Sequence, residues 1–171
     1  VSRLLPELTL KPVLEKILLS DRSAVIKQPM EETFRYLERT QKPDGLYSYW
    51  PGSSGYVSLT AYVVEFLLAA KEQGYKFPEA FLTRAIKALK DALRSDYTHF
   101  IDGESFTERV ESLYALAKAG EFDTAYAQEF LSRATAMNLY SEAKILDTFL
   151  DRQPDNQQAI QRLREDLWKS L

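Results

Sequence analysis

Few residues of this chain have the types and spacing that catalysis requires. His99 is the only histidine, and there is no cysteine. The absence of cysteine excludes a disulfide framework, a thiolate metal site and a cysteine nucleophile within these 171 residues. Residues 52–55, Gly-Ser-Ser-Gly, lack the Gly-x-Ser-x-Gly spacing of a serine nucleophile elbow, and no predicted strand precedes them. We therefore expect residues 52–55 to form a turn and His99 to have a structural or surface role.

The acidic side chains also lack the arrangement of a catalytic pair. Glu104, Glu108 and Glu111 are expected at the start of a helix and on its exposed face, where they do not form a matched general acid and base. The sequence consequently predicts no catalytic residue, no metal site and no cofactor, and we expect the chain not to be an enzyme.

Composition indicates one folded domain covering residues 1–171. The chain is long enough to bury a core without disulfides or metal, with 45% hydrophobic and 27% charged residues. A formal net charge of −3 and a pI near 5.3 give no basic surface for nucleic acid. No signal peptide is visible at Val1, and the first residue is not methionine, so we expect a piece of a longer protein.

An aromatic loop joined to a strongly apolar helix is the most informative stretch. Residues 42–45, Lys-Pro-Asp-Gly, fit a type I turn, and the loop 46–56 that follows is rich in tyrosine and tryptophan. Residues 58–73 then form a predicted helix that is apolar on nearly every side, which indicates an inner helix surrounded by protein. Its uninterrupted apolar runs are too short to cross a membrane.

The rest of the chain has helical periodicity, and no segment alternates as a strand does. A first helix extends from Leu4 to Leu18, with a kink or a break expected at Pro12. Pro29 is expected to open the second helix at its first position. The other predicted helices are an outer amphipathic one from Pro78, one from Ser105 with a capping box to Glu108, one with the stripe Tyr126, Phe130, Leu131, Ala134 and Met137, one with the stripe Leu139, Ala143, Leu146 and Leu150, and a last one from Asp155.

Apolar helices alternate with amphipathic ones along the chain. This alternation is typical of stacked helix hairpins, which form either an open solenoid or a closed ring with inner and outer helices. The periodicity does not distinguish these two arrangements.

The stretch KPDGLYSYWPG, followed after a short gap by LTAYVVEFLLAAKEQGY and Phe77-Pro78, resembles the thioester-containing domain of the bacterial alpha-2-macroglobulin family, relatives of the complement thioester proteins. The opening VSRLLPEL is similar to the sequence that follows that family's Cys-x-Glu-Gln motif. The resemblance implies an α/α toroid of helix hairpins within a large multidomain protease trap. In such a trap, a cysteine and a glutamine form an internal thioester that captures the attacking protease covalently after a bait region is cut.

This chain lacks the Cys-x-Glu-Gln motif, and Val1 corresponds to a position just after it. We therefore expect an incomplete ring that carries no thioester itself. Apolar faces along the first and last helices are then expected to be exposed or covered by another copy. The resemblance further implies target proteases and other domains of the same chain as partners, and a periplasmic or cell-envelope location. Insertion of this part into a membrane is not expected.

Tyr47, Tyr49 and Trp50 permit two interpretations. As large aromatic residues they could form a plug over one end of the helical core. By the resemblance, they would instead line the thioester pocket and exclude water from it. Complement relatives carry a transacylating histidine in this loop, where this chain has tyrosine and tryptophan, so His99 is not its counterpart.

Two other classes of function remain open at the level of sequence. One is an enzyme on the same toroid scaffold, such as a terpene cyclase or a polysaccharide lyase, although no DDxxD-like motif occurs. The other is a helical-repeat module that binds peptides, of the tetratricopeptide kind. A Cys-x-Glu-Gln motif encoded directly upstream of Val1 would favour the protease trap over both.

Overall fold

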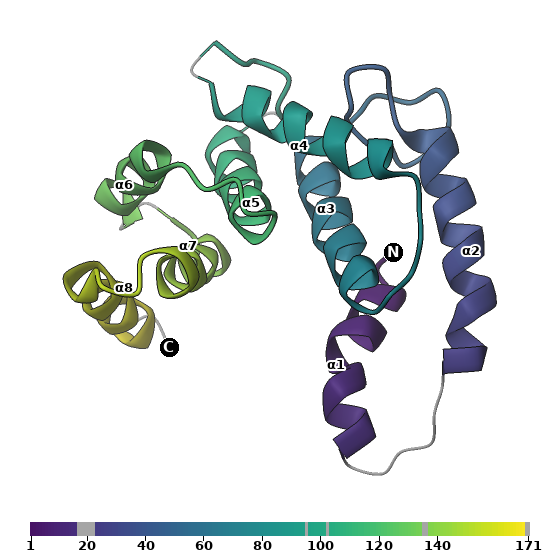
Figure 1. Cartoon of the computed structure of the whole chain (residues 1–171). Coiled ribbons are helices and arrows are strands. Elements are labelled where there is room, and N and C mark those ends of the chain that lie inside the picture. The colour runs from purple at the N-terminus through teal and green to yellow at the C-terminus, as the bar shows by residue number, and fades with distance from the viewer. Residues whose placement is uncertain (17–22, 95, 102, 135–136, 170–171) are drawn as a thin grey trace. The chain divides into compact units, whose positions relative to one another are not determined.

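The computed structural model describes residues 1–16, 23–94, 96–101, 103–134 and 137–169, and these residues form helices and no strand (Figure 1). The all-α prediction is therefore confirmed. Single β-bridges join Gln41 to Tyr47 and Tyr47 to Tyr56. The helices are α1 (Leu4–Lys16), α2 (Ser23–Thr40), α3 (Val57–Glu72), α4 (Glu79–Leu93), α5 (Ser105–Lys118), α6 (Thr124–Ser132), α7 (Leu139–Arg152) and α8 (Gln157–Lys169).

The chain divides into two compact units, residues 1–88 and residues 89–171. The first contains α1, α2, α3 and most of α4, and the second contains the end of α4 and the helices α5 to α8. The single domain over 1–171 and the arrangement of the hairpins as an incomplete toroid stay predictions.

Helix α3 is the inner helix of the first unit. Half of its residues are buried, including Val57, Val64 and Phe66 with no exposed surface. Helix α1 packs against it, and the N-terminal end of α1 lies beside α3 in Figure 1. The helix ends before Gly74, whose φ of +80° lets Tyr75 N–H donate back to the Ala70 carbonyl. The predicted inner helix is thus confirmed with its boundaries shifted by one residue.

Two prolines behave differently from the sequence prediction. Helix α1 extends through Pro12, so the predicted break is wrong and the alternative, a kink, stays a prediction. The predicted positions Ile17 and Leu18 lie outside the described residues. Pro29 lies inside α2, which begins at Ser23 and not at the proline. Because proline lacks an N–H, Pro29 costs one backbone hydrogen bond. That cost does not end the helix, and α2 is longer than predicted.

In the second unit, α7 packs against both α5 and α8 (Figure 1). Its buried face contains Ile145 and Phe149, whereas Leu139 and Leu150 of the predicted stripe are exposed. The predicted stripe therefore lies beside the buried face of α7 and not on it. The buried face was harder to recognise because it also includes the polar residues Ser141, Glu142 and Thr148.

Exposed apolar side chains occur on the first and last helices, as Leu10 of α1 and Trp168 of α8. If another copy covers such surfaces in solution, light scattering is expected to show a molar mass that rises with protein concentration. A constant monomeric mass at high concentration would contradict self-association.

Two predicted helix caps are wrong in detail. Glu108 does not close a capping box with Ser105, because its carboxylate accepts a hydrogen bond from Ile101 N–H at 2.8 Å and the residue is buried. Its carboxylate therefore fixes the preceding loop to α5. The last helix begins after Asn156, whose side-chain oxygen accepts from Ala159 N–H, and not at Asp155.

Glu142 of α7 is a buried carboxylate, only 6% exposed, and its Oε1 atom has no hydrogen-bond partner. Burial raises the pKa of Glu142, the nearby carboxylate of Asp166 raises it further, and Arg162 partly opposes the shift. Since the folded-state pKa lies above the unfolded one, the folded protein binds this proton more tightly. Stability is consequently lost as the pH rises from the unfolded-state pKa of Glu142 through its folded-state pKa.

Replacing Glu142 by glutamine is therefore expected to stabilise the protein relative to the original chain at pH 7. The advantage should shrink as the pH falls toward about 4, because the carboxyl is then mostly protonated in both states. Thermal melts of both proteins from pH 4 to pH 7 measure the difference. A difference in Tm that does not change over this range would show that the ionisation of Glu142 has no effect on stability.

Candidate functional site

The candidate site is built on the loop 41–56 of the first unit, which backbone and side-chain hydrogen bonds hold in place. Gly45 N–H donates to the Lys42 carbonyl at 3.0 Å, which confirms the predicted turn. Asp44 Oδ1 accepts from Leu46 N–H at 3.0 Å. Ser48 donates to the Thr40 carbonyl from both its N–H and its hydroxyl, so the loop is attached to the end of α2.

Gly45 permits a close approach between this loop and α4. Its φ is +93°, and an added Cβ atom would lie 2.3 Å from the Arg84 carbonyl oxygen. Only glycine combines that backbone conformation with that distance. The turn is therefore seated directly on the backbone of α4.

Tyr47 is the core residue of the loop. Its side chain is fully buried, and its N–H donates to Thr60 Oγ1 on α3 at 2.8 Å. The Thr60 hydroxyl in turn donates to the Tyr56 carbonyl at 2.6 Å, which fixes the start of α3. Burial raises the pKa of the Tyr47 phenol, and the positive charge of Arg84 opposes this effect. Tyr47 is thus neutral and serves as an apolar support for the loop.

Tyr49 and Trp50 lie at the surface. Their side chains are 50% and 67% exposed, and their ring centroids are 5.8 Å apart. Tyr49 also contacts Tyr56, with the ring centroids 5.3 Å apart. Of the three aromatic residues interpreted as a plug over the core, only Tyr47 packs into the core, whereas Tyr49 and Trp50 lie at the surface.

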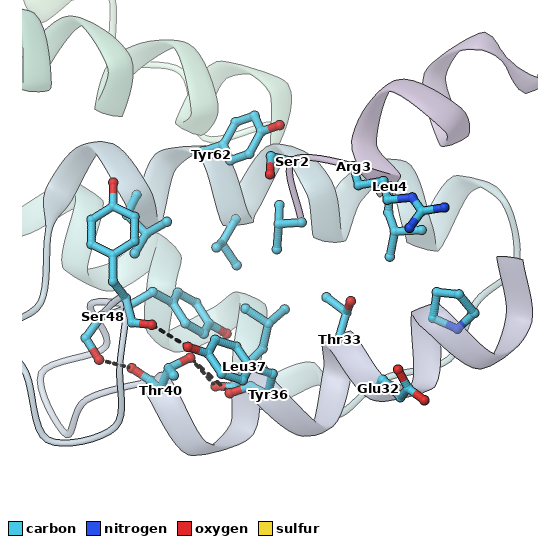
Figure 2. Close-up of a pocket in the computed structure, with 16 residues that line it drawn as sticks. Ser2, Arg3, Leu4, Glu32, Thr33, Tyr36, Leu37, Thr40, Ser48 and Tyr62 are labelled. Atoms are coloured by element: carbon cyan, nitrogen blue, oxygen red, sulfur yellow. Dashed lines mark hydrogen bonds between the residues drawn. The ribbon is translucent and has the colours of Figure 1, made fainter.

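A pocket of about 580 Å³ lies between α2, α3, the aromatic loop and the first residues of the chain. In Figure 2, Thr33 and Leu37 project from α2 toward the side of the pocket that α3 forms. Tyr47 and Tyr49 line this pocket, and Trp50 is not among the residues that line it. The full lining is Val1, Ser2, Arg3, Leu4, Pro29, Glu32, Thr33, Tyr36, Leu37, Thr40, Tyr47, Ser48, Tyr49, Leu59, Tyr62 and Val63.

The lining of the pocket is mostly neutral, and the pocket is partly open to solvent. Aliphatic side chains alternate with the hydroxyl groups of tyrosine, serine and threonine, and its charged residues, Arg3 and Glu32, are exposed. Among the residues that the structure describes, no group of three or more His, Asp or Glu side chains is placed to hold a metal ion. The buried part of this lining, which includes Leu4, Leu37 and Val63, suits an uncharged group.

Sequence reasoning missed the contribution of α2 to this site. Tyr36 donates a hydrogen bond from its hydroxyl to the Tyr49 carbonyl, drawn as a dashed line in Figure 2. No local motif marks Tyr36, because its partner lies 13 residues further along the chain. Tyr62 belongs to the apolar helix that the sequence predicted, but its position on the pocket side depends on tertiary packing.

The other residues considered for chemistry lie outside this pocket, in the second unit. His99 is exposed, and its ring centroid is 5.6 Å from that of Tyr97. Glu104 is exposed, as predicted, whereas Glu108 is buried against the preceding loop. Glu111 is only partly exposed, and one of its carboxylate oxygens is buried. The expected placement on an exposed face is therefore wrong for Glu108 and too simple for Glu111.

Solved structures with the same arrangement of helices are bacterial alpha-2-macroglobulins. The native conformation of the E. coli protein matches with a TM-score of 0.71 and 20% sequence identity, over 85% of this chain and 10% of that one. The chain has the fold of a helical part of these proteins. An E. coli structure that spans domain MG7 to the C-terminus matches with a TM-score of 0.69 and 18% sequence identity, over 84% of this chain and 24% of that one. Salmonella alpha-2-macroglobulin reacted with methylamine matches with a TM-score of 0.63 and 19% sequence identity, over 75% of this chain and 9% of that one.

The likeness confirms the predicted resemblance at the level of the fold. The chain spans only about a tenth of the length of two of these structures and about a quarter of the third. No protein-family model matches the chain, and a comparison with curated protein sequences gives no match. In the described part of the chain, no helix has the length and apolar character to span a membrane.

Proposed function

We propose that this chain is part of the thioester domain of a bacterial macroglobulin-like protease inhibitor, and that it forms the scaffold around the reactive bond. One observation carries the proposal. The pocket brings together residues 1–4 and Tyr47 and Tyr49 of the aromatic loop. By the resemblance, residues 1–4 follow directly after Cys-x-Glu-Gln. A thioester formed by that motif would therefore lie at this pocket.

The lining of the pocket suits this role. A thioester is an activated acyl group that water hydrolyses, and surroundings of low polarity slow that reaction. Leu4 and Leu37 contribute apolar surface, and Tyr47 contributes a neutral ring with a raised pKa. Tyr49 of the loop also lines the pocket and is 50% exposed. Trp50 would shield it only indirectly, through its contact with the ring of Tyr49.

The names of the structural neighbours agree with this chemistry. One Salmonella protein was solved after reaction with methylamine, and one E. coli protein after activation by trypsin. Methylamine is an amine nucleophile, and amines cleave thioesters by forming an amide and releasing a thiol. For this chain we propose proteases as targets and other domains of a longer chain as partners. We further propose a role as a trap without turnover, in the periplasm or at the cell envelope.

The longer protein tests this proposal. Its gene is expected to encode Cys-x-Glu-Gln directly upstream of Val1. Methylamine should then release one thiol per molecule of the purified protein, measured with a thiol reagent. Replacing the glutamine of the motif by alanine is the control, because its cysteine stays free from the start and methylamine releases nothing further. An upstream sequence without the motif would contradict the proposal.

A further inference from the structure

The tip of the aromatic loop, residues 49–54, is attached to the first unit by few polar contacts. Within the tip, Ser53 N–H donates to the Trp50 carbonyl, and the Ser53 hydroxyl donates to the same oxygen. The Ser48 hydroxyl, at the base of the loop, lies 2.9 Å from that carbonyl and 3.0 Å from the Thr40 carbonyl, and its one hydrogen can be donated to only one of them at a time. These bonds shape the tip but do not join it to a helix. The hydrogen bond from the Tyr36 hydroxyl to the Tyr49 carbonyl does so.

This hydrogen bond lies at the opening of the pocket. Tyr36 comes from α2 and Tyr49 from the loop, and both line the pocket while remaining partly exposed. Figure 2 shows the hydroxyl of Tyr36 directed at the carbonyl of the loop. Deeper in the pocket, Val63 of α3 lines the wall and is only 1% exposed. The contact between Tyr36 and Tyr49 thus lies on a route from solvent to buried surface.

The geometry points to Tyr36 as a latch that holds the aromatic loop over the pocket and limits entry to it. When the hydrogen bond opens, the tip loses its polar attachment to α2, while Tyr47 keeps the base of the loop in the core. The pocket is also open beside the exposed residues Ser2, Arg3 and Glu32, so the latch limits entry only at the end of the pocket that the loop forms. The latch concerns access to the pocket and does not depend on whether a thioester lies there.

The absence of cysteine allows access to be measured with one introduced thiol. Val63→Cys places that thiol on the pocket wall, and Val64→Cys places it on the next residue of α3, which is fully buried and does not line the pocket. The rate of reaction with Ellman's reagent is measured for each variant of the 171-residue chain under native conditions. The first thiol reports opening of the pocket, and the second reports opening of the whole unit.

Tyr36→Phe removes the hydroxyl and keeps the ring. Loss of one neutral hydrogen bond shifts an opening equilibrium by about fivefold, so the thiol of Val63→Cys should react about five times faster. The thiol of Val64→Cys should react at an unchanged rate. Tyr49→Phe is the matched control, because the carbonyl that accepts the hydrogen bond remains, and it should alter neither rate.

Two results would overturn the proposal. If Tyr36→Phe leaves the reaction of the Val63→Cys thiol unchanged, the hydrogen bond does not limit access. If both thiols react faster by the same factor, Tyr36 stabilises the whole unit and is not a latch for the pocket. Neither result bears on the presence of a thioester in the longer protein.

Discussion

Replacing Gly45 by alanine is expected to lower the free energy of unfolding by roughly 3 kcal/mol or more, through backbone strain combined with steric overlap. The positive φ of +93° is strained for any residue with a side chain. The new Cβ would also lie 2.3 Å from the Arg84 carbonyl oxygen, which belongs to the backbone of α4 and cannot rotate away. Either the turn or α4 must therefore move. Denaturant melts of the 171-residue chain measure the loss.

Gly52→Ala separates the two causes. Gly52 has a similar φ of +87°, but an added Cβ would meet no atom within 4 Å. This variant should cost only about 1 to 2 kcal/mol, the expected strain of a left-handed residue. Equal losses for the two variants would contradict the close approach between the turn and α4, because the overlap with Arg84 would then add no cost.

Tyr47→Ala is expected to cost about 3 to 5 kcal/mol, the range for removing a large aromatic side chain from a core. Tyr47 is fully buried between the loop and α3, so its loss leaves a cavity and weakens the base of the loop. Trp50→Ala should change stability by no more than about 0.5 kcal/mol, because Trp50 is 67% exposed. The same denaturant melts compare both variants with the original chain.

The test lies in comparing the loss of stability in Tyr47→Ala with the loss in Trp50→Ala. A loss for Trp50→Ala as large as that for Tyr47→Ala would mean that the tryptophan packs into the core in solution. A small loss for Tyr47→Ala would mean that the loop is not supported from within. Either result would contradict the division of the aromatic residues into one core residue and two surface residues.

The helical fold and the inner helix could be predicted because local signals and burial agree there. The apolar run of α3 has no polar face, Gly74 closes the helix, and residues 42–45 carry the composition of a turn. In each case, the sequence signal and the tertiary environment favour the same local structure. Boundaries at these positions were therefore correct to about one residue.

Other features depend on contacts between distant residues and left no local signal. Proline is typical of the first position of a helix, yet α2 continues on both sides of Pro29. Glu108 has the spacing of a capping residue, but its carboxylate bonds to Ile101 and is buried. The exposure of Trp50 and the hydrogen bond of Tyr36 follow from the path of the loop in space. A hydrophobic pattern does not encode that path.

The most direct test of the proposed protease trap is covalent capture. The longer protein, purified with its Cys-x-Glu-Gln motif intact, is mixed with trypsin and analysed on a denaturing gel. We predict a band that contains both proteins and survives boiling in denaturant and reductant, because an amide joins them. The band should disappear after prior treatment with methylamine or replacement of the motif's cysteine by serine. Cleavage of the protein by trypsin without any covalent product would contradict the account.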